Sequence, residues 1–567
     1  MPMDTDTGMK TKPNWLAATT GVLCYCVVGP VMGQGYGSLI TPVATPSGEN
    51  VPGAATVPDL GVQGATASDE TSTARAWAIV PRIGLTETMT DNINLASTNK
   101  QSGLISELSP GVRIDARTAR LKMFLDYQLN GIFYSTGDNG NQTQSALNAF
   151  GTLEAIDNWL FVDFSGQISQ QVINQFGQQS ASNIYNTGNT TQTQTYAVSP
   201  YIRGQLGGSA DYLLRYNASY TNSGSSEISN VTLSQWLGQI RGNTRFQNLN
   251  WAIDGSQQNT TYSQVDGQVG FLPEQDYDDT RIRALLIYKL FPEFRLSGSG
   301  GWESNNYQSR DNESQGTYGA GFDWTPTERT QASGFWEHRF FGTGHNVLLS
   351  HRFPLSAIRY TDTKDVSLIP NQLNNTGLGT VYDQYFQIFA SLIPDPVNRD
   401  TYVRNFLNQA GIAPNAQAIN NYLTNRPQVQ RNQQLSLVFY GSRNSITFIA
   451  NRSNSQPLTR APNGLDSIVS EAGTVTQQGY AVSFSHRLTQ LTGLNLIASR
   501  QKNKGDLTNQ FSTRDTTLTY YQIGISTRLG ARTVGALNAR HQDFDGSDLT
   551  TTPYTENALI ASVTMVF

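Results

Sequence analysis

Residues 557–567 read NALIASVTMVF, and every second residue counted back from the end is apolar. The apolar set is Leu559, Ala561, Val563, Met565 and Phe567. Alternation with a period of two predicts a β-strand with one apolar face. The last residues of a soluble domain usually fray. A strand that continues to an aromatic final residue is therefore predicted to belong to the fold itself, with its apolar face against lipid.

The same alternation recurs from Trp77 onward. Three examples are RLKMFLDYQLNG at 120–131, ADYLLRYNASY at 210–220 and TRIRALLIYKL at 280–290. Alternating segments of about ten residues are typical of transmembrane β-strands, whereas strands in soluble proteins are usually about five or six residues long. Short turn-like connections and long polar connections mostly alternate, as periplasmic turns and extracellular loops do in outer-membrane barrels.

The strand candidates between Trp77 and Phe567 number about 22, within a range of roughly 16 to 24, and such counts are usual for bacterial barrels. Backbone groups in lipid have no water to bond, so the sheet has to close. The sequence thus predicts an all-β protein, a large antiparallel transmembrane β-barrel over residues 77–567, in the bacterial outer membrane.

The amino-acid composition agrees with an outer-membrane barrel and argues against a nucleic-acid-binding protein. Only 14% of the 567 residues are charged and 10% are aromatic, whereas average soluble chains carry about 25% charged residues. The net charge of -5 argues against a nucleic-acid partner. The five histidines lack zinc-protease spacing, and the sequence has no nucleophile elbow, Walker loop or calcium loop. We therefore predict no enzyme activity, no catalytic residue, no metal site and no cofactor.

Residues 1–33 combine Lys10 and Lys12 with a short apolar run and small residues near its end. This order predicts a secretory signal peptide, with translation starting at Met1 or Met9. The run is shorter than the ~20 residues that a membrane span needs, and a retained anchor is the alternative. Residues 34–76 are rich in Pro, Gly, Ser, Thr and Ala and predict a disordered periplasmic leader.

Between residues 365 and 427 the alternation stops, and apolar residues recur at helical spacing. Tyr385 and Phe389 share one predicted helix, and Val403, Phe406 and Leu407 form a stripe on the next. This helical insert leaves from the extracellular side. It either folds into the lumen as a gate or packs on the outer rim. Its five apolar side chains are the gating candidates.

Charged residues indicate which face of each strand lines the lumen. An Arg or Lys that faces lipid at the midplane costs about 2–4 kcal/mol, so we expect the charged faces to point inward. The lumen-facing candidates are Arg120, Lys122, Phe124, Asp126, Arg203, Arg215, Arg281 and Arg283. Two explanations fit them. They form ion pairs that stiffen a wide barrel, or they form a cationic track for an anionic glycan, with Phe124 as a stacking surface.

Three segments resemble one known family. They are WAIVPRIGLTETMTDNINLA at 77–96, IPDPVNRDTYVRNFLNQAGI at 393–412 and VQRNQQLSLVFYGSRNSITFIANRS at 429–453. They are similar to the outer-membrane β-barrel proteins associated with the PEP-CTERM (exosortase) system. The resemblance implies a role beside exopolysaccharide synthesis and export machinery. It implies no catalytic residues.

We therefore expect a pore or accessory component for exopolysaccharide secretion. The expected partners are outer-membrane lipid, the barrel assembly machinery, the exopolysaccharide itself and periplasmic export proteins. The assembly machinery is expected to recognise Phe567 as an assembly signal. A plugged structural or assembly component and a general porin for small solutes are the alternatives. A nutrient receptor energised from the inner membrane ranks last, because it needs a plug domain and few residues precede Trp77.

Overall fold

The computed structural model describes residues 76–567 apart from 137–139, 208, 247, 268–269, 273, 310, 369–402, 404–422, 425, 459–471, 508–512 and 548–550. The predicted signal peptide and nearly all of the predicted leader lie outside these residues. So does most of the predicted helical insert, with its candidates Tyr385, Phe389, Phe406 and Leu407. Within the described part of the chain, no helix is long and apolar enough to cross a membrane.

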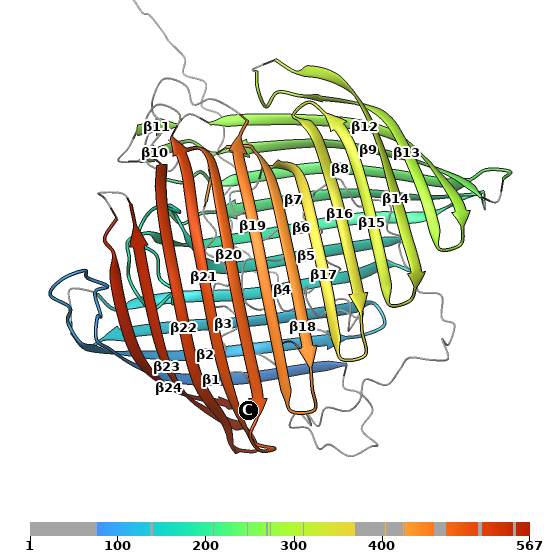
Figure 1. Cartoon of the computed structure of the whole chain (residues 1–567). Coiled ribbons are helices and arrows are strands. Elements are labelled where there is room, and N and C mark those ends of the chain that lie inside the picture. Colours follow the sequence, from blue (N-terminus) through green and yellow to red (C-terminus); the bar gives the residue numbers. More distant parts are fainter. Residues whose placement is uncertain are drawn as a thin grey trace, which may run out of the picture.

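Twenty-two long strands form one antiparallel sheet, which confirms the predicted strand number, and two short strands form a separate hairpin (Figure 1). The long strands are β1 Trp77–Thr90, β2 Gly103–Arg117, β3 Leu121–Tyr134, β4 Gln142–Ile156, β5 Leu160–Val172, β6 Thr190–Leu206, β7 Ala210–Asn222, β8 Val231–Asn243, β9 Leu249–Tyr262, β12 Gln275–Phe291, β13 Phe294–Asn305, β14 Glu313–Thr327, β15 Thr330–Arg339, β16 Gly342–Arg352, β17 Ser356–Ser367, β18 Gln428–Tyr440, β19 Asn444–Pro457, β20 Ala472–Arg487, β21 Thr492–Leu507, β22 Thr513–Gly530, β23 Thr533–Gly546 and β24 Tyr554–Val566. The hairpin consists of β10 Val265–Gly267 and β11 Gly270–Leu272.

The sheet closes on itself because β1 pairs with both β2 and β24. The β1–β24 ladder runs from Arg82 opposite Val566 to Thr90 opposite Ala558. The backbone N–H of Phe567 extends it by donating to a carbonyl of β1, 2.9 Å away. Each long strand has a neighbour on both sides, so this sheet has no free edge. The predicted closed antiparallel barrel is confirmed.

Side chains alternate between a polar lumen and an apolar outer face. On β24, Leu559 and Val563 are 46% and 45% exposed, whereas Glu556 points inward and is fully buried. Large apolar side chains are exposed in the same way around the barrel, as at Leu214 and Ile282. Soluble proteins rarely expose contiguous apolar patches beyond a few hundred Å². A barrel with an apolar outer band and a polar interior is a membrane barrel.

The two ends of the barrel differ in their connections. Turns such as 118–120 and 292–293 join strands at one end, and loops such as 91–102 and 173–189 join them at the other. Short turns are periplasmic and longer loops extracellular in barrels of this kind. The strands of the near wall cross those of the far wall at a steep angle (Figure 1), as expected for the tilted strands of a closed barrel.

We expect Phe567→Ala to lower the amount of folded barrel in the outer membrane. The residue directly follows the strand that closes the sheet, and it is 55% exposed on the outer apolar face. The measurement is the fraction of protein that runs as a heat-modifiable band in outer-membrane fractions. Thr564→Ala, on the lumen face of the same strand, is the matched control. An undiminished band for Phe567→Ala would contradict the role of this residue in assembly.

Candidate functional site

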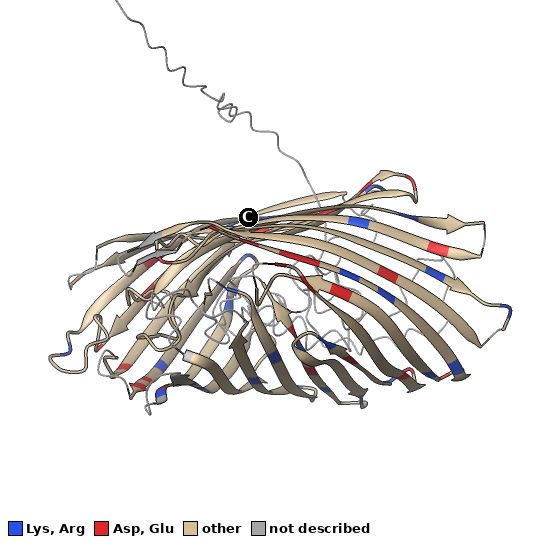
Figure 2. Ribbon diagram, turned by 90° about the horizontal axis from the view of Figure 1, so that it is seen from above, with Lys and Arg blue, Asp and Glu red and all other residues tan. Residues whose placement is uncertain are grey.

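The lumen holds a cavity of about 610 Å³ between β1–β5 and β21–β24. Amide and hydroxyl side chains are prominent in its lining. Examples are Gln128, Asn130, Asn148, Gln167, Gln522 and Asn538. They lie here because the alternation that sends apolar residues to lipid sends their neighbours inward. Charged residues are sparse along the strands (Figure 2). The cavity wall combines its amide and hydroxyl groups with apolar side chains, and its charged members are Arg82, Glu107, Arg113, Asp126 and Arg540.

Loop 173–189, which joins β5 to β6, crosses the mouth of the barrel above this cavity. Its Gln175 carbonyl accepts hydrogen bonds from Asn503 Nδ2 of β21 at 3.0 Å and from Thr516 Oγ1 of β22 at 3.1 Å. The Tyr554 hydroxyl of β24 donates to the Gln179 carbonyl at 2.6 Å. Because β1–β4 separate β5 from β24 in the closed sheet, these bonds join walls that are not neighbours. The loop is thereby fixed inside the mouth.

A buried ion pair anchors the far end of the loop. Arg540 Nη2 of β23 donates to Glu556 Oε1 of β24 at 2.9 Å and to the Tyr185 hydroxyl at 2.8 Å. The Tyr185 hydroxyl and Thr90 Oγ1 both donate to that same Glu556 oxygen. Burial raises the pKa of the Tyr185 hydroxyl, so this donor keeps its proton at physiological pH. The buried charges are therefore paired and hydrogen-bonded, as buried charges need to be.

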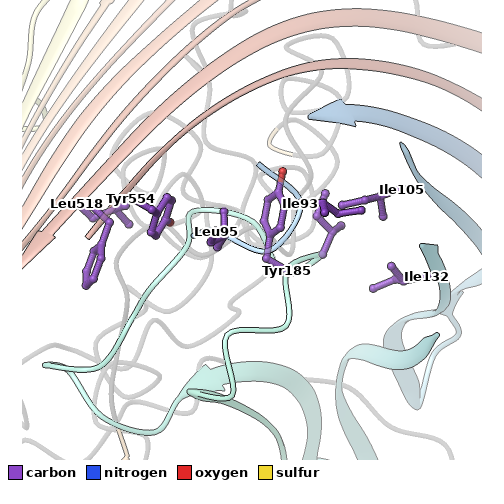
Figure 3. Packing of buried hydrophobic residues seen from close by; sticks show 9 residues of the cluster. Ile93, Leu95, Ile105, Ile132, Tyr185, Leu518 and Tyr554 are labelled. Carbon is purple, nitrogen blue, oxygen red and sulfur yellow. The ribbon is translucent and has the colours of Figure 1, made fainter. Parts of the chain in front are cut away.

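Apolar side chains pack near Tyr185, the residue through which the loop reaches this ion pair (Figure 3). Ile93 and Leu95 from loop 91–102 belong to one buried cluster with Tyr185. The other buried members come from loop 173–189 and from the strands around it, namely Ile105, Ile132, Ile184, Leu518, Phe544 and Tyr554. Two loops and five strands meet in this cluster. Together with the ion pair, it holds loop 173–189 in one position.

A second segment spans the mouth. The N–H of Leu423 donates to the carbonyl of Val172, the last residue of β5, at 3.2 Å. Residues 423–427 lead directly into β18, the sixteenth of the 22 long strands, which lies across the barrel from β5, the fifth. Leu423 and Val403 are completely buried. Of the predicted gating candidates, Val403 is the one that the structure describes.

The cavity also contains Asp126, one of the predicted lumen residues, and its charge is paired. Arg82 Nη2 of β1 lies 2.6 Å from Asp126 Oδ1. Predicted Phe124 packs on Phe150 with ring centroids 4.9 Å apart, and the Arg113 guanidinium lies 5.2 Å from its ring centroid. Since Phe124 is buried by these contacts, its ring is not an open stacking surface.

The other predicted arginines on the strands also contact partners inside the barrel. Arg215 pairs with Asp163 at 2.9 Å and Arg283 with Asp254 at 3.0 Å. Arg281 pairs with Glu337, and the guanidinium of Arg203 lies 4.4 Å from the ring centroid of Phe161. These contacts cross between strands and therefore stiffen the wall.

Arg120 and Lys122 lie at the periplasmic end. Arg120 was expected to face the lumen, but β3 begins at Leu121, so the strand alternation does not reach it. Its side chain is 62% exposed in turn 118–120 and pairs with Asp157 of the next periplasmic turn at 3.2 Å. Lys122 lies on the lumen face of β3, opposite Thr152 of β4.

Loop 173–189 was not among the sequence-predicted site residues, because its Asn-, Gln-, Ser- and Thr-rich composition is that of an ordinary surface loop. The sequence feature that could have indicated an infolded loop was the presence of three apolar residues, Phe176, Ile184 and Tyr185, within that polar stretch. Among the residues that the structure describes, no group of His, Cys, Asp or Glu is placed to hold a metal ion.

No protein-family model matches the chain, and no curated protein matches it. Several solved structures align with it over most of its length. The FrpB iron transporter (F3-3 variant) from Neisseria meningitidis has 10% identity, a TM-score of 0.44, and coverage of 86% of this chain and 81% of that chain. The siderophore receptor PirA from Pseudomonas aeruginosa has 9% identity, a TM-score of 0.35, and coverage of 86% and 80%. The outer membrane protein opdK from Pseudomonas aeruginosa has 7% identity, a TM-score of 0.30, and coverage of 86% and 99%.

The structure of the chain itself identifies the class of membrane protein. The long strands close without an edge, the lumen is polar, and apolar side chains cover the outside. Only a closed barrel satisfies the backbone hydrogen bonds of strands that cross a bilayer. The protein is a transmembrane β-barrel of the bacterial outer membrane.

Removing one partner of the anchor should destabilise the barrel. We expect Glu556→Ala to lower the free energy of unfolding by about 3–5 kcal/mol, because it leaves Arg540 buried without its carboxylate. Tyr185→Phe keeps the ion pair, removes one hydroxyl and should cost about 1–3 kcal/mol. The measurement is reversible urea unfolding in lipid vesicles. Arg120→Gln, at an exposed ion pair, is the control and should change little. Equal effects of Glu556→Ala and Arg120→Gln would refute the anchor.

Proposed function

We propose that this barrel is a conduit for saccharide chains in exopolysaccharide secretion, with loop 173–189 as its constriction. The lining of the cavity carries the proposal. Amide and hydroxyl groups both donate and accept hydrogen bonds, as the hydroxyl groups of a sugar do. The cations that line this cavity, Arg82, Arg113 and Arg540, are each paired with a carboxylate. Such a surface suits a neutral, hydrated glycan better than a strongly anionic one.

The position of loop 173–189 supports its role as a constriction. Residues 181–184 line the cavity from the loop side, while the opposite side of the cavity is strand wall. The loop is bonded to β21–β24 and therefore narrows the path instead of swinging freely above it. A constriction held by side-chain contacts sets the size of solute that passes.

A plugged structural or assembly component is the second candidate. The observation that favours it is the segment at Leu423, which reaches from β18 to β5 across the mouth. A general porin for small solutes is the third, because the same lining accepts other small polar solutes. Single-channel conductance distinguishes the saccharide conduit, the plugged component and the general porin.

The test is single-channel conductance of the full-length protein in planar bilayers, with neutral and anionic oligosaccharides added in turn. We expect an open channel that neutral oligosaccharides block at lower concentration than anionic ones. A conducting channel that no oligosaccharide blocks would favour the general porin. A silent barrel that is correctly folded would overturn the conduit.

Shortening the infolded loop should widen the path. We expect replacement of residues 177–187 by a short Gly-Ser linker to raise the conductance and weaken oligosaccharide block, because the segment that crosses the mouth is lost. The matched control shortens loop 223–230, which joins β7 to β8 and makes none of the contacts to β21–β24. If both deletions leave the conductance of the wild type unchanged, loop 173–189 is not the constriction.

A further inference from the structure

A band of cations lies on the outer face of the barrel toward its extracellular end. It consists of Lys364 on β17, Arg431 on β18, Arg452 on β19, and Arg500, Lys502 and Lys504 on β21. We call these six residues the outer basic band. They share a face with the exposed apolar residues Phe439, Ile446 and Leu496, because an even number of positions separates residues on one face of a strand.

Strand register makes the band continuous around the wall. Lys364 lies directly opposite Arg431. Arg452 lies opposite Gln478 of β20, and Gln478 lies opposite Lys502. Neighbouring strands are about 4.7–4.9 Å apart. Arg431 lies opposite Asn454, which is two positions from Arg452 on the same face of β19. The cations therefore follow one another from β17 to β21, with Gln478 between Arg452 and Lys502.

The depth of the band can be read along the strands. Going toward the extracellular end, Leu496 precedes Arg500 on β21, and Phe448 precedes Arg452 on β19. Exposed Tyr480 lies opposite Arg500, and tyrosine favours the boundary between hydrocarbon and headgroups. The band thus begins where the apolar belt ends. At that depth a cation avoids the cost of facing the bilayer midplane.

The band carries excess positive charge. Among the described side chains of this face, Asp362 pairs with Arg431 at 2.6 Å, and Asp515 of β22 pairs with Lys502 at 3.1 Å. Arg452 and Arg500 are exposed and form no ion pair within the described part of the chain. From β17 to β22, two carboxylates with described side chains thus face six cations. Asp543 and Asp545 lie on the same face of β23, opposite Thr519 and Thr517, so the excess positive charge ends at β22.

The rest of the outer face differs. By strand register, the described residues of β2–β8 place neither Lys nor Arg on their outer face. On β12, the outer face carries Asp276 and Asp278 near the extracellular end, where they accept hydrogen bonds from Thr261 and Asn259 of β9. The cations are therefore gathered on one side of the barrel and are not a general feature of its rim.

We propose that the outer basic band binds the phosphate groups of a phosphorylated glycolipid in the outer leaflet of the membrane. Arg and Lys form charge-assisted hydrogen bonds with phosphate oxygens, and cations near an anionic bilayer surface attract its headgroups. The exposed apolar residues below the band contact the acyl chains of the same lipid. This site lies outside the lumen and does not depend on what the lumen carries.

The test uses purified full-length protein in nanodiscs of neutral phosphatidylcholine, with diphosphoryl lipid A as the probe and bound lipid counted by native mass spectrometry. We expect the double variant Arg452→Gln/Arg500→Gln to bind the probe about 30-fold more weakly, from about 1 kcal/mol for each cation near an anionic lipid surface. The control Arg120→Gln/Arg532→Gln removes two exposed cations from periplasmic turns and should bind as wild type.

A second measurement needs no variant. Wild-type protein should bind diphosphoryl lipid A and fail to retain its dephosphorylated form. Equal binding of the two forms would overturn the proposal, as would equal binding by the wild type and the Arg452→Gln/Arg500→Gln variant. Displacement of the lipid by an equimolar amount of inorganic phosphate would also overturn it, because the site would then belong to a free anion and not to a lipid.

Discussion

Pairing of β1 with β24 is the constraint on which the rest of this structure depends. It joins residues 468 to 484 positions apart in the chain, from Thr90 opposite Ala558 to Arg82 opposite Val566. Without it, two strand edges would face hydrocarbon with unpaired N–H and C=O groups, each of which costs several kcal/mol in lipid. Once the sheet is closed, strand parity decides which side chains meet lipid and which meet the lumen.

Closure also divides the lumen into two regions with different chemistry. From β9 to β17, buried arginines meet buried carboxylates across strands, as where Arg339 lies 2.9 Å from Glu303 and 2.5 Å from Asp365. Buried pairs of this kind add little net stability but fix the strands that carry them, since breaking one leaves an uncompensated charge. From β1 to β5 and β21 to β24, amides, hydroxyls and apolar side chains surround an open cavity, and its arginines, Arg82, Arg113 and Arg540, are paired with carboxylates. Ion pairs thus stiffen both parts of the wall, and the part formed by β1–β5 and β21–β24 also leaves space for a solute.

Sequence reasoning predicted the strands well and the loops poorly, for a physical reason. Period-two alternation is a local property, so strand number and the inward direction of residues such as Arg215 and Arg283 follow from it. Strand ends are less well defined, and Arg120 was placed one residue beyond the alternation that begins at Leu121. The anchor of loop 173–189 joins Tyr185 to Arg540 and Glu556, more than 350 positions away. No local pattern contains such a contact.

By itself, the sequence determined that this protein is an outer-membrane β-barrel of about 22 strands, because alternation and the length of the alternating segments are written residue by residue. The tertiary structure alone decided which loop enters the lumen and which charges are paired. It also decided that cations from four strands, among them Arg431, Arg452 and Arg500, gather on one outer face. These properties arise from register between strands, and register is defined only when the sheet has closed.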